Sequence, residues 1–358
     1  FHPPTLDFLE PFGASKVLID QGLIAPTFQY RDRKNGCLAE FDFDLISNET
    51  NHPFRVQCEQ FKLNLYLLDW LYDQGVKDIY FEHKIKNIEQ NGDSVTVVAD
   101  TPNGDRSYIG KWLIGADGAN SIVRQLSGIN FEGFTWEERF LVVSTTYDYK
   151  KYIKNLSYVN YYADPQQWFF LLKVPGLWRV MFPVQKEENE ADIFGAECVE
   201  NRMQWVQASP KTFEIAHRTL YKVHQRVAAK YREGRIFLIG DAAHINNPLG
   251  GMGMNGGIHD AFNLAEKISL FWHNQKNLSV LDLYEKQRRP IALEYVNKQS
   301  IKNKQNLEAN TLEAQEAFRV FLSELMEDQS RAREYMMRVS MISSLREARR
   351  NDYFSNRS

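Results

Sequence analysis

GDAAHINNPLGGMGMNGG, residues 240–257, contains the string Gly251-Met-Gly-Met-Asn-Gly256, which fits the GxGxxG pattern of dinucleotide binding. A dinucleotide-binding GxGxxG directly follows a strand and opens the helix of a βαβ unit. Here an apolar strand is expected at residues 236–239, and about nine residues separate its end at Asp241 from Gly251. The match to GxGxxG is therefore coincidental, and the stretch needs another explanation.

The residue types of this stretch suit a ligand-binding loop. An acidic residue at the carboxyl end of a strand, here Asp241, lies where α/β sheets bind ligands, and its carboxylate accepts hydrogen bonds from sugar hydroxyls. Pro248 stiffens the loop, and Gly250, Gly251 and Gly253 let the backbone approach a flat or charged ligand because they carry no Cβ. The apolar residues that follow recur at helical spacing, so a positive helix end faces the loop. The alternative is a glycine-rich surface turn before a helix.

A second loop, GADGANSIVR at residues 115–124, also follows an apolar strand. Asp117-Gly118 is typical of a tight turn, and Ser121 is a good residue to cap a following helix. Arg124 suits either a phosphate ligand or a surface salt bridge. Taken alone, this segment is equally consistent with a structural turn.

The bulk composition is that of an ordinary globular protein. Its 358 residues exceed what one hydrophobic core usually holds, so we expect two domains. Lys plus Arg number 43 and Asp plus Glu number 46, a net charge of -3 that gives no reason to expect a nucleic-acid partner. The three cysteines are far apart, so we expect structural thiols in a reducing cytoplasm rather than disulfides or a metal site. No apolar run reaches the roughly 20 residues of a membrane-spanning helix.

Periodicity predicts alternating helical and strand-rich sections. Helices are expected over residues 1–22, 59–74 and 191–207, after Gly253, and over most of the chain from Leu281. Strands with hairpin turns at 91–92 and 103–104 fill residues 79–114, and an antiparallel sheet is expected within 130–230. The order predicts a discontinuous α/β domain of residues 1–128 and 225–300, an inserted β-rich domain of 129–224, and a helical region of 301–358. For the charged C-terminal helices we expect a solvated face or a subunit contact in a homodimer, with a basic membrane-binding helix as the alternative.

Together, the two loops resemble those of the single-component FAD-dependent aromatic hydroxylases, the group typified by para-hydroxybenzoate hydroxylase. The order and spacing of GDAAHINNPLGGMGMNGGIHDAFNLA and GADGANSIVR match that family. The resemblance extends to FHPPTLDFL at 1–9, EQFKLNLYLLDWL at 59–71 and HQRVAAKYREGRIFLIGDAAH at 224–244, and so covers nearly all of residues 1–300. It implies an FAD-binding Rossmann-like α/β domain with an inserted antiparallel β-sheet domain for the substrate.

The resemblance also implies roles for individual residues. Asp241 would hold a ribityl hydroxyl of FAD, Pro248 would lie near the face of the flavin ring, and Gly250 belongs to the same loop. The pyrimidine edge would be surrounded by Gly251, Gly253, Met254 and Asn255. Asp117 and Gly118 would serve the pyrophosphate, and Gln60 the ribityl-phosphate region. His244 becomes a structural loop residue, and no side chain is implied as a catalytic acid or base or as a metal ligand.

Two features depart from the family pattern. Met252 stands where family members often have Gln, which changes the hydrogen bonding of the loop. The family's own GxGxxG lies some tens of residues before the position that matches Phe1. We therefore expect a strand–helix–strand segment upstream of Phe1 in the natural protein.

The function implied is that of a monooxygenase that hydroxylates a phenol-like aromatic with NADH or NADPH and O2, through a flavin hydroperoxide. The alternatives are an oxidase, reductase or halogenase on the same scaffold, or a binding protein that has lost the cofactor. The substrate is expected between the β-rich domain and the flavin. By alternation, about half of a set of aromatic residues on the expected strands should face it: Tyr161, Tyr162, Trp168, Phe169, Phe170 and Trp178. His224 and Arg226 are expected to pack in the core or at the surface.

Overall fold

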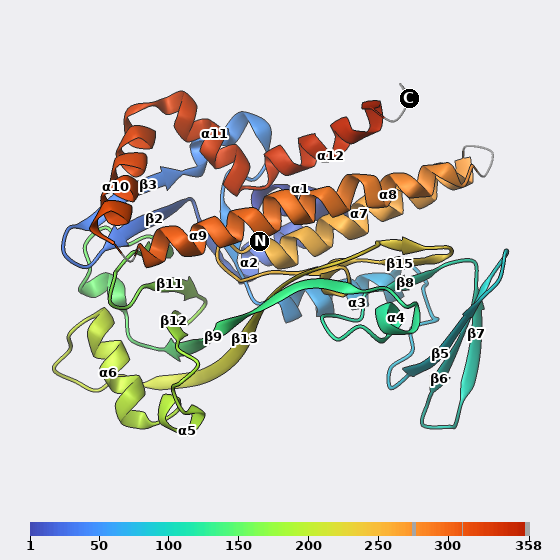
Figure 1. The fold of residues 1–358 in the computed structure, drawn as a ribbon, viewed down its shortest axis with the longest axis horizontal. Coiled ribbons are helices and arrows are strands. Elements are labelled where there is room, and N and C mark those ends of the chain that lie inside the picture. Colours follow the sequence, from blue (N-terminus) through green and yellow to red (C-terminus); the bar gives the residue numbers. More distant parts are fainter. Residues whose placement is uncertain (274–276, 310, 355–358) are drawn as a thin grey trace. The chain divides into compact units, whose positions relative to one another are not determined.

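The computed structural model describes residues 1–273, 277–309 and 311–354 and confirms the expected α/β class (Figure 1). Its contacts form two compact units. Unit 1 comprises Phe1–Leu67, Trp136–Val223 and Lys302–Ile342, and unit 2 comprises Leu68–Thr135, His224–Ile301 and the described residues from Ser343. This division groups residues 1–67 with the β-rich segment, whereas the sequence-based division grouped them with 225–300. The sequence-based boundaries stay a prediction.

Unit 1 is built on a sheet in which the neighbouring strands run β9–β12–β11–β10–β2–β3, with β10 and β2 parallel. One face of the sheet packs against α6 in a hydrophobic core that includes Tyr162, Phe169 and Trp178. Most elements of the unit lie wholly within it: α1 (Pro3–Leu9), η1 (Glu10–Phe12), α2 (Ala14–Gln21), β1 (Leu23–Ala25), β2 (Thr27–Asp32), β3 (Gly36–Asp42), η2 (Phe43–Glu49), β4 (Arg55–Gln57), η3 (Tyr149–Lys151), β10 (Val159–Tyr162), β11 (Phe169–Val174), β12 (Leu177–Val184), α5 (Glu190–Ile193), α6 (Ala196–Val206), α10 (Leu312–Glu327) and α11 (Gln329–Val339).

The aromatic residues of these strands divide between the two faces as alternation predicts. Tyr161 stacks on Phe170 at 5.5 Å between ring centroids, on the face opposite the core of Tyr162 and Phe169. Trp168 packs edge-on against Phe140 rather than in that core. Half of the six aromatics lie on the face that packs against α6, which we call the covered face: Tyr162, Phe169 and Trp178. The other half lie on the opposite face: Tyr161, Trp168 and Phe170.

Two regions expected as continuous helices are interrupted. The first is split at Gly13, which has φ +72 and lies between η1 and α2. The second is split at Gly195, whose extended backbone separates α5 from α6. Helical spacing of apolar residues predicts which face is buried, but it does not show a single residue that leaves the helical region.

Unit 2 contains two small sheets and a pair of long helices, α7 and α8, that lie side by side (Figure 1). The predicted hairpin turns at 91–92 and 103–104 connect β5, β6 and β7. Its elements are β5 (Lys84–Gln90), β6 (Val95–Asp100), β7 (Arg106–Gly110), β8 (Leu113–Gly115), α4 (Ile122–Leu126), β14 (Arg232–Glu233), β15 (Ile236–Leu238), η4 (Gly240–Ala242), β16 (His244–Ile245), α7 (Met252–His273), α8 (Ser279–Ile291) and the π-helical η5 (Ala292–Asn297).

Five elements contain a boundary between the units, so the chain passes from one to the other within them. They are α3 (Gln60–Asp73), β9 (Phe131–Thr145), β13 (Ile215–Ala228), α9 (Lys298–Glu308) and α12 (Ile342–Phe354). The helix predicted over 59–74 is confirmed by α3. Over the described ranges, no helix is both long and apolar enough to cross a bilayer.

Candidate functional site

The two predicted loops leave the same edge of one sheet in unit 2. β8 and β15 are parallel neighbours, with Ile114 opposite Phe237. Immediately after the paired residues, the N–H of Ile239 donates to the carbonyl of Gly115 over 3.0 Å. Since the carboxyl ends of parallel strands meet at one edge, the segments that carry Asp117 and Asp241 begin side by side.

The guanidinium of Arg124 connects these two loops. Its Nη1 donates to the carbonyl of Ala242 over 2.8 Å and its Nη2 to that of Ala119 over 2.8 Å. The guanidinium lies 3.7 Å from the ring centroid of Phe131, and burial lowers its pKa. Arg124 is thus a buried connector between loops rather than the surface salt bridge that was one of its two expected roles.

The first loop is ordered by caps on the short helix α4. Ser121 accepts from the N–H of Arg124 over 2.9 Å, as predicted for a cap. Asp117 Oδ2 accepts from the N–H of Val123 over 3.1 Å, and its side chain is exposed. Gly118 has φ +81, as the tight turn requires. Asp117 therefore already has one structural bond and keeps acceptor positions that face solvent.

The GD loop, the stretch from Gly240-Asp241 to the start of α7, begins at the short helix η4. Asp241 reaches solvent, and it has no hydrogen-bond partner among the residues that the structure describes. Partial burial of its carboxyl raises the pKa of Asp241, and His244 opposes the rise. Asp241 therefore offers free acceptor atoms at the edge where the two strands end.

A buried ion cluster holds the base of the GD loop. Asp260, fully buried in α7, accepts from Arg288 Nε over 2.6 Å and from His244 Nε2 over 2.9 Å. It also accepts from the backbone N–H of Gly240 over 3.2 Å. Burial alone would raise the pKa of Asp260, but Arg288 and His244 hold it below its usual value. His244 thus has the structural role expected from the resemblance.

Between β16 and α7, residues 246–251 of the GD loop form a tight turn. Asn247 Oδ1 accepts from the N–H of Leu249, and the carbonyl of Pro248 accepts from the N–H of Gly251 over 2.9 Å. Gly250 has φ +101 and Gly251 φ +68, conformations that suit glycine. A 3-10 turn, a short strand and this loop separate β15 from α7, so the GxGxxG string does not have the Rossmann arrangement.

The remaining candidate residues lie at two helix starts. Gly253, Met254 and Asn255 are in the first turn of α7, and the Asn255 side chain donates to the carbonyl of Gly251 over 2.7 Å. Gln60 is exposed at the start of α3, in unit 1. Unit 2 thus brings nine of the ten candidates into three adjoining segments: Asp117, Gly118, Asp241, Pro248, Gly250, Gly251, Gly253, Met254 and Asn255.

Comparison with known proteins identifies the family. A family described as an FAD binding domain matches residues 1–299. The chain belongs to the FAD-dependent aromatic hydroxylases. It is 30% identical over 302 residues to para-nitrophenol 4-monooxygenase of Pseudomonas sp. (strain WBC-3), covering 83% of this chain and 74% of that protein. It is 29% identical over 310 residues to 6-hydroxy-3-succinoylpyridine 3-monooxygenase HspB of Pseudomonas putida (strain DSM 28022 / S16), covering 86% and 78%.

The fold of the hydroxylase agrees with this assignment. The crystal structure of p-nitrophenol 4-monooxygenase PnpA from Pseudomonas putida DLL-E4 superposes with a TM-score of 0.88 at 28% identity. That superposition covers 96% of this chain and 87% of that one. These comparisons confirm the resemblance inferred from the two loops and identify this protein as an FAD-dependent monooxygenase of aromatic compounds.

The hydroxylase's own residues fit the chemistry of FAD. Helix α7 has 22 residues with no acidic side chain in its first turn, so its positive end is not neutralised there. Such an end stabilises the negative charge of a reduced flavin. Asp241 offers acceptor atoms, and the buried Nδ2 of Asn247 has no hydrogen-bond partner within the described part of the chain. The individual roles of the candidate residues stay predictions.

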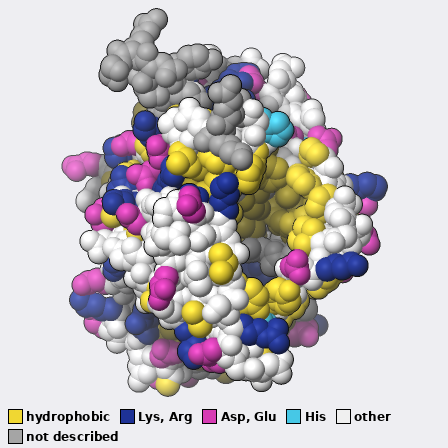
Figure 2. Space-filling view, turned by 90° about the vertical axis from the view of Figure 1, so that its right-hand side faces the viewer, with side chains coloured by type: hydrophobic (Ala, Val, Ile, Leu, Met, Phe, Trp, Pro, Cys, Tyr) yellow, Lys and Arg dark blue, Asp and Glu magenta, His cyan; other side chains and the backbone are white. Residues whose placement is uncertain are grey.

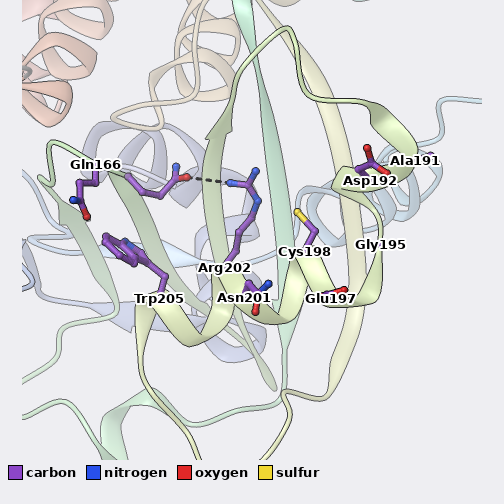
Figure 3. Close-up of a pocket in the computed structure, with 10 residues that line it drawn as sticks. Gln166, Ala191, Asp192, Gly195, Glu197, Cys198, Asn201, Arg202 and Trp205 are labelled. Atoms are coloured by element: carbon purple, nitrogen blue, oxygen red, sulfur yellow. Dashed lines mark hydrogen bonds between the residues drawn. The ribbon is translucent and has the colours of Figure 1, made fainter.

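A groove of about 690 Å³ in unit 1 is a different feature. Arg202 and Trp205 project from α6 at this groove (Figure 3). Arg202 donates to Gln167 over 3.0 Å and pairs with Glu188, and Arg33 covers the Trp205 ring at 3.8 Å. Because these cationic and aromatic groups already have partners, the groove does not resemble a prepared ligand site, and no candidate residue lines it.

Sequence reasoning missed Asp260, Arg288 and Gln225, each of which organises the GD loop. One signal was available for Asp260, since it is the first acidic residue of α7, the helix that directly follows the GD loop. Arg288 and Gln225 carry no such signal because they lie on other elements, and neither is adjacent to the loop in sequence. His224 and Arg226, expected to pack, join β13 to β9 through Thr135 and Phe131.

Proposed function

We propose that the hydroxylase adds a hydroxyl group to a single-ring phenol or hydroxypyridine, with NADH or NADPH as the reductant and O2 as the oxygen donor. One oxygen atom of O2 replaces a ring hydrogen as hydroxyl and the other leaves as water, with the two electrons and one proton supplied as hydride by the nicotinamide and a second proton supplied by solvent. FAD, when bound, supplies the chemistry that connects nicotinamide oxidation to oxygen activation. The names of the two curated relatives support this class, because both describe a hydroxylated six-membered aromatic ring.

The supporting feature of this chain is an incompletely covered area of the unit 1 sheet, which we call the sheet patch. It consists of Val142, Phe170, Leu172 and Arg179, all half-buried and on the face opposite the core of α6. Leu172 is opposite Arg179 in register, and Met181 is opposite both Phe170 and Val142. A flat apolar surface beside one cation suits an aromatic ring that carries a negative group.

Arg179 is the polar member of the sheet patch. It has no hydrogen bond or ion pair with any residue that the structure describes. Glu59 is close enough for Arg179 to affect its pKa, but the Glu59 carboxylate is already paired with Lys62 at 2.8 Å. We propose that Arg179 binds the ionised ring hydroxyl of the substrate, which keeps the ring electron-rich for attack by an oxygen electrophile.

The test replaces Arg179 with an apolar residue of similar length. For Arg179→Met we expect the KM for para-nitrophenol to rise about tenfold, the equivalent of one charge-assisted hydrogen bond, with a smaller change in kcat. NADH and NADPH oxidation would be followed spectroscopically, and the oxygenated product identified by mass spectrometry.

Lys173 provides the matched control because it is also half-buried, lies on β11, and is opposite Trp178 on the covered face. Lys173→Met should leave the KM within about twofold of the wild-type value. An equal rise in both variants, or no rise in Arg179→Met, contradicts the role of Arg179. Failure of a panel of phenols and hydroxypyridines to stimulate nicotinamide oxidation or yield an oxygenated product contradicts the proposed function.

A further inference from the structure

The side chain of Gln225 joins two segments of unit 2 that are distant in sequence. Gln225 lies in β13 and is 1% exposed. Its Oε1 accepts from the backbone N–H of Asn247 over 3.1 Å. Its Nε2 donates to Asn297 Oδ1 over 2.8 Å and to Ser300 Oγ over 3.0 Å. Because both ends of the amide are used, neither a glutamate nor an apolar residue can replace Gln225 without loss of a bond.

An irregular helix supplies one side of this arrangement. The π-helical segment η5 lies between α8, which contains Pro290, and α9. Such turns are rare and concentrate at functional sites. η5 ends at Asn297, and Ser300 follows one turn later. The Ser300 hydroxyl donates to the carbonyl of Asn297 over 3.1 Å, which leaves its oxygen to accept from Gln225.

The other side is the loop between β16 and α7. Asn247 is fully buried, and its Oδ1 accepts from the N–H of Leu249 over 3.1 Å, closing a turn around Pro248. The carbonyl of Pro248 in turn accepts from Gly251, directly before α7 begins. The position of Pro248 and the approach to the helix start therefore depend on where Asn247 is held.

We propose that Gln225, Asn247, Asn297 and Ser300 form a positioning network, the Gln225 bridge, that fixes the 246–251 loop against FAD. Gln225 is proposed as a positioning residue, since its side chain bonds to Asn247, Asn297 and Ser300 and would act on FAD through the loop that it holds. The inference deepens the proposed function, and it rests on the proposed placement of Pro248 beside the flavin.

The test measures FAD affinity rather than turnover alone. FAD would be titrated into FAD-free protein, with flavin fluorescence reporting the dissociation constant and thermal unfolding reporting the fold. Methionine is similar in length to glutamine, and Gln225→Met removes the hydrogen bonds to Asn247 and to Asn297 and Ser300. We expect it to weaken FAD binding about tenfold and to change the visible absorption band of the bound flavin.

Asn297 offers a pair of variants that tests the bridge if Gln225→Met does not fold. Asn297→Asp keeps an oxygen that accepts from Gln225, so FAD affinity should stay within about twofold of the wild type. Asn297→Leu removes that oxygen and should weaken FAD binding severalfold. The double variant Gln225→Met/Asn297→Leu should bind FAD about as weakly as Gln225→Met alone, because both changes break the same network.

Val97→Ala controls for general destabilisation. Val97 is 8% exposed in β6 and belongs to the main hydrophobic core of unit 2. Its truncation should lower the unfolding temperature and leave the FAD dissociation constant unchanged. The inference is overturned if folded Gln225→Met binds FAD like the wild type, if Asn297→Asp and Asn297→Leu behave alike, or if Val97→Ala weakens FAD equally.

A separate variant distinguishes the inference from its premise. Pro248→Gly should weaken FAD binding if the loop contacts the flavin as proposed. If Pro248→Gly has no effect on FAD affinity, the placement of the loop is wrong and the inference fails with it. If Pro248→Gly weakens FAD binding and the Gln225 variants do not, the placement stands and only the bridge is wrong.

Discussion

Two adjacent buried residues of α7, His259 and Asp260, lead us to expect that the stability of the protein depends on pH. Burial lowers the pKa of His259 to about 3, and Arg288 adds to the effect while Asp260 opposes it. Asp260 keeps its charge because Arg288 and His244 outweigh the effect of burial on its pKa. Below pH 6.5, His259 is therefore protonated in the unfolded chain and still neutral in the folded chain.

We predict that the free energy of unfolding falls as pH is lowered from about 6.5 to about 4.5, because of His259. A histidine whose pKa is lowered by folding reduces the free energy of unfolding by up to about 1.4 kcal/mol for each pH unit in that window. The measurement is urea unfolding of FAD-free protein at several pH values. His259→Gln should have a shallower pH dependence than the wild type, and His273→Gln, an exposed control, should not. Parallel curves for wild type and His259→Gln would contradict the assignment.

Among the elements, β9 and β13 approach each other closely at Gln225 of the Gln225 bridge. These two long strands are neighbours in the sheet (Figure 1). Gly133 of β9 has φ +134, and a Cβ there would lie 2.0 Å from the carbonyl oxygen of Gln225. Backbone cannot move aside as a flexible side chain can, so only glycine allows the strands to approach this closely.

Gly133→Ala should therefore destabilise the protein by about 3 kcal/mol or more, the sum of a strained backbone and a steric conflict. Gly176→Ala is the matched control, because Gly176 also has a positive φ, +75, but its added Cβ would meet nothing within 4 Å. That variant should lose only about 1 kcal/mol. Chemical denaturation measures both, and equal losses would show that backbone strain alone, rather than strand approach, explains the requirement for glycine.

At the scale of the whole molecule, positive and negative side chains nearly balance, with 43 Lys and Arg against 46 Asp and Glu. Lys and Arg alternate with Asp and Glu over the face seen in Figure 2, in keeping with the net charge of -3. Charges mixed in this way set up no long-range field of one sign over this face.

We predict that FAD stabilises the intact protein through Asp241. At a concentration about 100 times its dissociation constant, FAD should add about 2.7 kcal/mol to the free energy of unfolding. Differential scanning calorimetry with and without FAD would measure the rise in Tm. Asp241→Ala should show a smaller FAD-induced rise at the same FAD concentration. Asp105→Ala, which removes an exposed partner of Lys86, should show the full rise, and identical behaviour of the two variants would contradict the role of Asp241.

The local properties of the chain could be read from sequence because they depend on near neighbours. Apolar period and turn residues predicted α3, the two hairpins of β5–β7, and the cap at Ser121. The GD loop was recognisable because strand, glycine, proline and helix follow one another in a fixed order. The interruptions at Gly13 and Gly195 were missed because they change the path of the chain without altering the apolar pattern.

The amino-acid sequence alone therefore determined the family, the α/β class and the two loops that follow apolar strands. Only the tertiary structure decided that β8 and β15 are parallel neighbours, and so that Asp117 and Asp241 belong to one edge. It also decided that Asp260 pairs with Arg288 and that Gln225 links Asn247 to Asn297. Pairing between distant residues follows from strand register and helix packing, and the periodicity of a single segment carries no information about either.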